Sequence, residues 1–119
     1  MSPLAAILIA AIALLHAWFV LLETVLFKTR GRRAFGISAE KAEIMAPAMS
    51  NQGCYNGFLV AALVAGLVHP DAAIARAFAV YGLACVAVAG VWGAVTVKRS
   101  IFLIQSVPAL LALAALFLM

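Results

Sequence analysis

Hydrophobic residues fall into four long runs that are separated by short polar segments. The runs cover roughly residues 3–27, 50–68, 75–97 and 101–119. A helix needs about 20 mostly apolar residues to cross a bilayer, and each run is near that length. The pattern therefore predicts an all-α protein, an integral membrane four-helix bundle that forms one transmembrane domain over 1–119.

Helix-start signals refine this pattern. Ser2 and Pro3 place a capping hydroxyl and then a proline at the start of the first run. No basic segment precedes the run and apolar sequence follows it, so we interpret it as a retained span and not a signal peptide. We expect a second helix over 39–68, capped by Ser38 and amphipathic in its first third. Pro47 should kink this helix or divide a surface segment from the span.

Composition supports the membrane assignment. The 119 residues are 68% hydrophobic and 10% charged, against about 45–50% apolar and about 25% charged in soluble domains. A chain this short leaves much of its surface exposed, so the excess apolar side chains must face lipid. The net charge of +4 predicts no nucleic acid partner, because the basic residues lie between apolar runs. Cys54 and Cys85 form no CxxC or Cys/His cluster, and we expect no metal site.

The basic residues predict an orientation. The loop over 28–49, which includes the amphipathic helix start, contains Lys28, Arg30, Arg32, Arg33 and Lys41. The loop after the third run holds Lys98 and Arg99, whereas Asp71 offsets Arg76 near the middle loop. The positive-inside rule places the first and third loops in the cytoplasm and both termini of this multi-pass protein outside.

Polar groups at the head of the second span are the main candidate site. They follow i, i+1, i+4, i+5 spacing and are Asn51, Gln52, Tyr55 and Asn56. Polar groups within a span are costly, so this stripe indicates function. In the first span His16 and Glu23 are seven positions apart. They therefore share a face, about 10 Å apart along the axis, with Glu23 at the depth of the stripe.

The other two spans contribute Trp92, Thr96 and Gln105 at the same end. Because groups from four spans share one depth, we expect a polar pocket in the cytoplasmic half of the bundle. Its candidate catalytic residues are His16, Glu23 and Tyr55, and its candidate substrate-binding residues are Asn51, Gln52, Asn56, Trp92, Thr96 and Gln105. Hydrogen bonding between helices, at about 0.6–2 kcal/mol each, is the alternative role for these side chains.

Small residues recur every fourth position in the second run, at Gly53, Gly57, Ala61 and Ala65. Gly90 and Ala94 offer a similar face in the third run. Such faces let helices approach closely. We expect packing within the chain or a homo-oligomer through the Gly53/Gly57 or the Gly90/Ala94 face.

The block Asn51–Leu59 resembles the signature of the family called domain of unknown function 1304. The resemblance extends over nearly the whole chain, through the segments His16–Glu23, Phe35–Gly36, Gly90–Lys98 and Gln105–Pro108. Leu15 departs from it, since similar sequences often carry an acid just before the histidine. The resemblance implies a four-span protein of the bacterial inner (cytoplasmic) membrane, and the family name assigns no activity.

Three functions fit these residues. The first is binding or converting a small lipophilic molecule, with Glu23 or His16 as acid or base and the stripe orienting an oxygen of the substrate. The second is a small proton-coupled transporter, or a transporter subunit, that acts as an oligomer and loads its proton on Glu23. The third is haem binding through His16. The expected partners are membrane lipid and a small lipophilic ligand, and the cofactor stays open.

Overall fold

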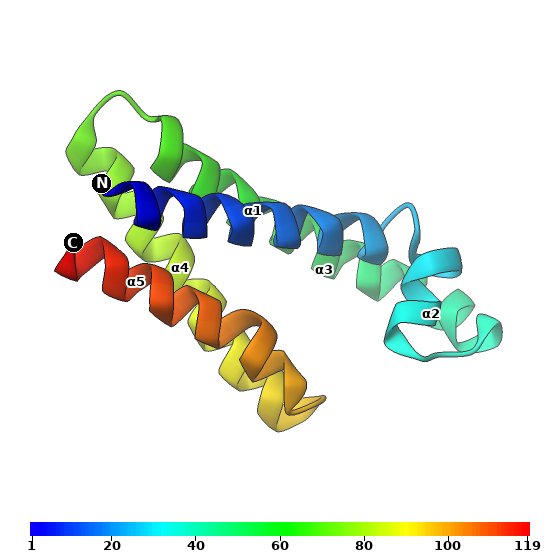
Figure 1. The fold of residues 1–119 in the computed structure, drawn as a ribbon. Coiled ribbons are helices and arrows are strands. Elements are labelled where there is room, and N and C mark those ends of the chain that lie inside the picture. Colours follow the sequence, from blue (N-terminus) through cyan, green and yellow to red (C-terminus); the bar gives the residue numbers. More distant parts are fainter. The chain divides into compact units, whose positions relative to one another are not determined.

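The computed structural model describes residues 1–119, and every element in it is helical, as the sequence predicts (Figure 1). The elements are α1 (Pro3–Glu23), η1 (Phe27–Gly31), α2 (Arg32–Phe35), α3 (Ala39–Val68), α4 (Ala72–Thr96), η2 (Phe102–Ser106) and α5 (Val107–Leu118), where η marks a π-helical turn. Three of the helices, α1, α3 and α4, are long and apolar enough to cross a membrane. A shorter apolar helix covers Phe102–Leu118, so a fourth span stays a prediction.

Side-chain caps begin the three long helices. Ser2 Oγ accepts a hydrogen bond from the N–H of the third residue of α1 at 3.2 Å, and Ser38 Oγ does the same for α3 at 3.2 Å. The Asp71 carboxylate accepts from the N–H groups of Ala73 and Ile74 at 2.9 and 3.0 Å at the start of α4. These bonds satisfy N–H groups that have no partner within a helix.

Two features of the helices bear on the expected spans. α1 ends at Glu23, before the predicted limit near residue 27, and the chain continues into the π-helical turn η1. Pro47 lies inside α3, and the helix continues through it, so the proline does not divide this element.

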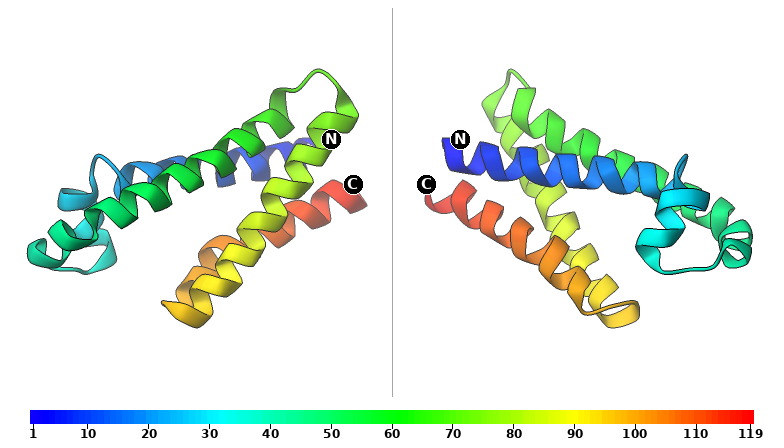
Figure 2. Two further views of the ribbon diagram at one scale, coloured as in Figure 1. Left: turned by 180° about the vertical axis from the view of Figure 1, so that it is seen from behind. Right: turned by 45° about the vertical axis from the view of Figure 1, so that its right-hand side comes forward.

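The chain forms two compact units, and each is described by itself. The first unit contains residues 1–13 and 59–119. Its core consists of small and branched apolar side chains from α1, α3, α4 and α5, among them Ile9, Leu63, Leu83, Val86 and Ala112. α4 and the η2–α5 segment run side by side in opposite directions (Figure 2).

Gly90 sets the approach of η2 to α4 in this unit. A Cβ at Gly90 would overlap the Ser106 hydroxyl and lie 2.6 Å from the Ser106 N. The Ser106 hydroxyl donates to the Ala87 carbonyl at 2.7 Å. η2 ends two residues before Pro108, which has no N–H and whose ring displaces the carbonyl four residues earlier, that of Ile104 in η2. The wider π-helical turn accommodates that proline.

The second unit contains residues 14–58. Here the second half of α1 lies beside the first half of α3, and η1 and α2 connect them (Figure 1). Gly36 ends α2 with φ 69°, a conformation that favours glycine. The Ile37 N–H bonds the Arg32 carbonyl at 2.9 Å, which closes a Schellman motif. Buried Phe27 contacts the Phe35 ring at 6.2 Å between centroids, so the connection packs on itself.

Candidate functional site

A hydrogen bond between α1 and α3 forms the centre of the candidate site. The Asn56 amide donates to Oε1 of Glu23 at 2.5 Å. Glu23 is 7% exposed and Asn56 is 9% exposed. Glu23 is the only buried acidic residue in the chain. A buried carboxyl group is costly without a hydrogen-bond donor, and Asn56 supplies one.

Gly53 makes this pairing sterically feasible. It lies one turn before Asn56, on the same side of α3, and a Cβ there would be 2.6 Å from Thr24 Cγ2 and 3.2 Å from Glu23 Cβ. The end of α1 therefore approaches α3 more closely than any residue with a side chain would permit. The Thr24 hydroxyl turns back onto its own helix and donates to the Val20 carbonyl at 2.6 Å.

The other members of the stripe point away from this contact. Asn51 and Gln52 are exposed, and Tyr55 is 60% exposed. The Tyr55 ring meets the Phe58 ring edge to face, with 5.6 Å between centroids. The structure thus brings Asn56 to Glu23 and leaves three polar side chains on the outer surface of the same two turns. Their role in ligand binding stays a prediction.

His16 lies deeper along α1, two turns from Glu23, and is buried. Its imidazole meets the Phe19 ring edge to face at 5.2 Å. The chain has one further histidine, His69, in the turn between α3 and α4. No group of three or more His, Cys, Asp or Glu side chains could hold a metal ion. Haem binding through His16 stays a prediction.

Trp92, Thr96 and Gln105 belong to the first unit. The Thr96 hydroxyl donates to the Trp92 carbonyl at 2.7 Å, and the Trp92 side chain is exposed. Gln105 is half-buried, and its Cβ would lie 3.0 Å from a Cβ at Gly90. The first unit also has a surface hollow of about 250 Å³, lined by Ile74, Ala77, Phe78 and Tyr81, which contains none of the candidate residues. The expected pocket that joins all four spans stays a prediction.

The structure shows one packing contact that was not foreseen from the sequence, at Ser106, and it shows which glycines of the predicted small-residue faces pack within the chain. Ser106 is fully buried and bonds α4, although its only sequence signal is a polar side chain inside an apolar run. Gly53 contacts the end of α1, and Gly90 contacts η2, so both glycines take part in packing within the chain. A Cβ at Gly57 would have no heavy atom within 4 Å. The predicted homo-oligomer faces stay untested.

The sequence was also compared with known proteins. No curated protein and no solved structure matches it. A family model described as protein of unknown function (DUF1304) matches residues 10–117. This range includes Glu23, Asn56 and every other candidate residue of the site, and it covers nearly the whole chain. The chain therefore belongs to the DUF1304 family.

Proposed function

We propose that this membrane protein binds a small lipophilic molecule beside the Glu23–Asn56 pair and converts it by acid/base chemistry. The observation that supports this function is the hydrogen bond of a buried carboxyl group to an amide on another helix. Ionisable residues inside a span are costly and mark functional sites. Packing alone does not require an acid at this position, because an apolar side chain would fill the same space without that cost.

Each side chain has a distinct role in this proposal. Glu23 exchanges a proton with the substrate through Oε2, because Asn56 already occupies Oε1. The exposed groups of Asn51, Gln52 and Tyr55, which face outward from the same two turns, hydrogen-bond an oxygen of the substrate that lies away from the proton-exchange position. The apolar part of the substrate lies among the lipid acyl chains beside the span. Acid/base catalysis needs the carboxyl group within hydrogen-bond reach of the proton, directly or through one water.

Small molecules that co-purify with the protein test this function. The wild type and the variants Glu23→Gln and Tyr55→Phe are purified in a mild detergent, and the solvent extract is analysed by mass spectrometry. Glu40→Gln and Tyr81→Phe are matched controls, because both residues are exposed and lie outside the site. A charge-assisted hydrogen bond contributes about 1.5–3 kcal/mol, so we expect Glu23→Gln to reduce the amount of bound molecule by about tenfold or more.

The controls should retain the same molecule in the same amount as the wild type. Tyr55→Phe should reduce the amount of bound molecule less than Glu23→Gln does, because a neutral hydrogen bond contributes only about 0.5–1.5 kcal/mol. Identical extracts from all five proteins would rule out binding at this pair.

A proton-coupled transporter is the second candidate. It is supported by the single buried acid, Glu23, which would load and release the proton. Four short helices are few for a transporter, so this function needs a homo-oligomer, and the open space beside Gly57 offers a face for one. Proteoliposomes separate the two candidates. Uptake of the extracted molecule that depends on a pH gradient and on Glu23 favours transport, whereas conversion without a gradient favours the enzyme.

A further inference from the structure

A positively charged segment connects the end of α1 to the apolar part of α3. Residues 28–46 contain five basic side chains and two acidic ones, a net charge of +3. The only ion pair in the chain, at 3.0 Å, joins Lys28 to Glu43. It leaves four basic side chains without an acidic partner, and these are Arg30, Arg32, Arg33 and Lys41. Arg30, Arg33 and Lys41 are exposed, and Arg32 is half-buried.

The length of α3 places this segment at the membrane surface. α3 has 30 residues, and at 1.5 Å per residue it is about 45 Å long. The hydrocarbon core of a bilayer is only about 30 Å thick. With the apolar residues 50–68 in that core, the preceding residues of α3 reach the phospholipid headgroups. η1 begins four residues after the last residue of α1 and leads into α2, and both lie in the same unit as this part of α3.

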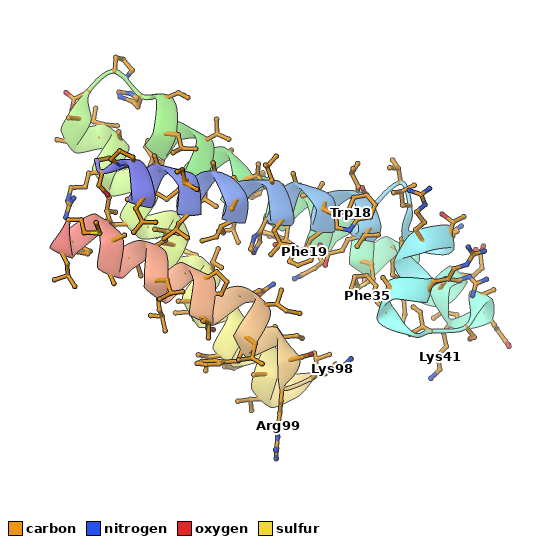
Figure 3. The ribbon with its side chains drawn as sticks, in the orientation of Figure 1. Trp18, Phe19, Phe35, Lys41, Lys98 and Arg99 are labelled. Atoms are coloured by element: carbon orange, nitrogen blue, oxygen red, sulfur yellow. The ribbon has the colours of Figure 1, made fainter.

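Large apolar side chains are exposed among the charged ones. Ile44 is 77% exposed, and Phe35 and Met45 are exposed as well. The Lys41 side chain projects away from the ribbon (Figure 3). A single exposed apolar residue is ordinary. Three of them within a basic segment at headgroup depth are typical of chains that lie at the boundary between headgroups and acyl chains.

We propose that residues 28–46 form a binding surface for anionic phospholipids in the leaflet where α1 ends. Arg30, Arg32 and Arg33 bind the lipid phosphates, because guanidinium groups match phosphate geometry through paired hydrogen bonds. Ile44 and Met45 enter the outer acyl region. The segment thereby holds the end of α1, and with it the Glu23–Asn56 pair, at a fixed depth. This surface is independent of any substrate that the pair binds.

Lipid titration of the full-length protein tests the proposal. The protein in detergent micelles is titrated with phosphatidylglycerol or with phosphatidylcholine of the same acyl chains, and bound lipid is counted by native mass spectrometry. We expect the wild type to prefer phosphatidylglycerol. Each of Arg30→Gln, Arg32→Gln and Arg33→Gln should reduce that preference by about fivefold, the value of one basic residue at an anionic surface. Added salt should weaken the preference as well.

Two further variants separate lipid binding from net charge and from folding. Lys98 and Arg99 project from the turn between α4 and η2 (Figure 3), and Lys98→Gln/Arg99→Gln removes two charges there. This control should reduce the preference by less than any of the three arginine variants, because Lys98 and Arg99 lie outside residues 28–46. Ile44→Ser, at an exposed position, should weaken the binding of both lipids equally because it removes only apolar contact. Equal binding of both lipids by the wild type, or an equal loss in the Lys98/Arg99 control, would overturn the proposal.

Discussion

At the scale of single residues, the bond from Asn56 to Glu23 is the feature with the clearest energetic consequence. Glu23 is only 7% exposed, so its carboxyl group depends on protein donors. Asn56 is buried with it and supplies an N–H directly. Measured hydrogen bonds between membrane helices average only about 0.6 kcal/mol, because the unfolded chain finds other partners in the membrane. Removing the donor should lower the free energy of unfolding by more than this average, because the carboxyl group that it served stays buried without a partner.

We predict that Asn56→Ala lowers the free energy of unfolding by about 1–3 kcal/mol, because it leaves the buried Glu23 carboxyl group without a donor. Unfolding by SDS in mixed micelles, followed by circular dichroism, measures the change. A double-mutant cycle with Glu23→Ala should give a coupling energy of about 0.5–3 kcal/mol. Asn51→Ala is the matched control, since Asn51 is exposed, and its effect should stay within about 0.5 kcal/mol. Additive effects of the two alanine substitutions would contradict the pairing.

The sequence indicated both partners of this bond without indicating that they meet. At about 100° per residue, the stripe from Asn51 to Asn56 covers an arc of about 140° around α3. Asn56 lies at one edge of that arc, only about 60° from Gly53. The close contact at Gly53 therefore draws Asn56 inward, while Asn51 and Tyr55 stay outside. Residue spacing gives the arc, but only the position of the neighbouring helix decides which edge becomes buried.

At the scale of helices, two glycines on α3 differ in what surrounds them. Gly53 is in contact with the end of α1, and Gly57, one turn later, has open space beside it. Both belong to the same small-residue pattern in the sequence. Four residues along an α-helix correspond to a rotation of about 40° beyond one full turn, and this rotation carries Gly57 away from the face of Gly53 and Asn56 that meets α1.

Gly53→Ala should therefore destabilise the second unit by about 1–3 kcal/mol, as expected when a methyl group is forced into a filled contact. The added Cβ would press on Thr24 and Glu23 and separate the Glu23–Asn56 pair. Gly57→Ala is the matched control and should be neutral or slightly stabilising, because alanine favours a helix by about 1 kcal/mol over glycine. The same SDS unfolding assay applies to both variants. If Gly53→Ala were as stable as Gly57→Ala, α1 and α3 would have to be farther apart at Gly53 than the structure places them.

Hydropathy predicted the long helices well and their ends less well. The second helix was expected over 39–68, and α3 covers those residues. The first run was expected to continue to residue 27, yet α1 ends at Glu23. Val25, Leu26 and Phe27 are as apolar as the helix before them, so hydropathy carries no signal for the turn. The ends marked by a capping side chain, Ser38 and Asp71, are the ones that local chemistry specifies.

At the scale of the whole molecule, composition decides the class of the protein and hydropathy assigns each polar group a depth. Neither fixes the rotation of a helix about its own axis. Glu23 and Gln105 were expected to share a pocket because they share a depth, and that pocket stays a prediction. A hydropathy pattern also cannot predict contacts that depend on shape, such as that of Ser106 with Gly90, because it does not fix how each helix is rotated.

The charge distribution leads to a prediction about orientation. Seven basic residues lie in the segments that follow α1 and α4, the first of which extends into the start of α3, and they are Lys28, Arg30, Arg32, Arg33, Lys41, Lys98 and Arg99. Because cytoplasmic loops carry the excess of Lys and Arg, we expect both termini on the opposite side of the membrane. Alkaline phosphatase fused after Met119 in a bacterial host should be active, and green fluorescent protein at the same position should not fluoresce. Fusions truncated after Arg99 should show the reverse.

A charge variant shows whether the two basic loops cause this orientation. Replacing Arg30, Arg32, Arg33, Lys98 and Arg99 by Gln removes five of the seven charges, and the fusions should then report a mixed orientation. Fluorescence of the wild-type fusion after Met119 would reverse the assignment. The outcome also decides where the candidate site opens, because Glu23 lies at the end of α1 that leads into the first basic loop. With the loop in the cytoplasm, the Glu23–Asn56 pair lies at the cytoplasmic end of α1.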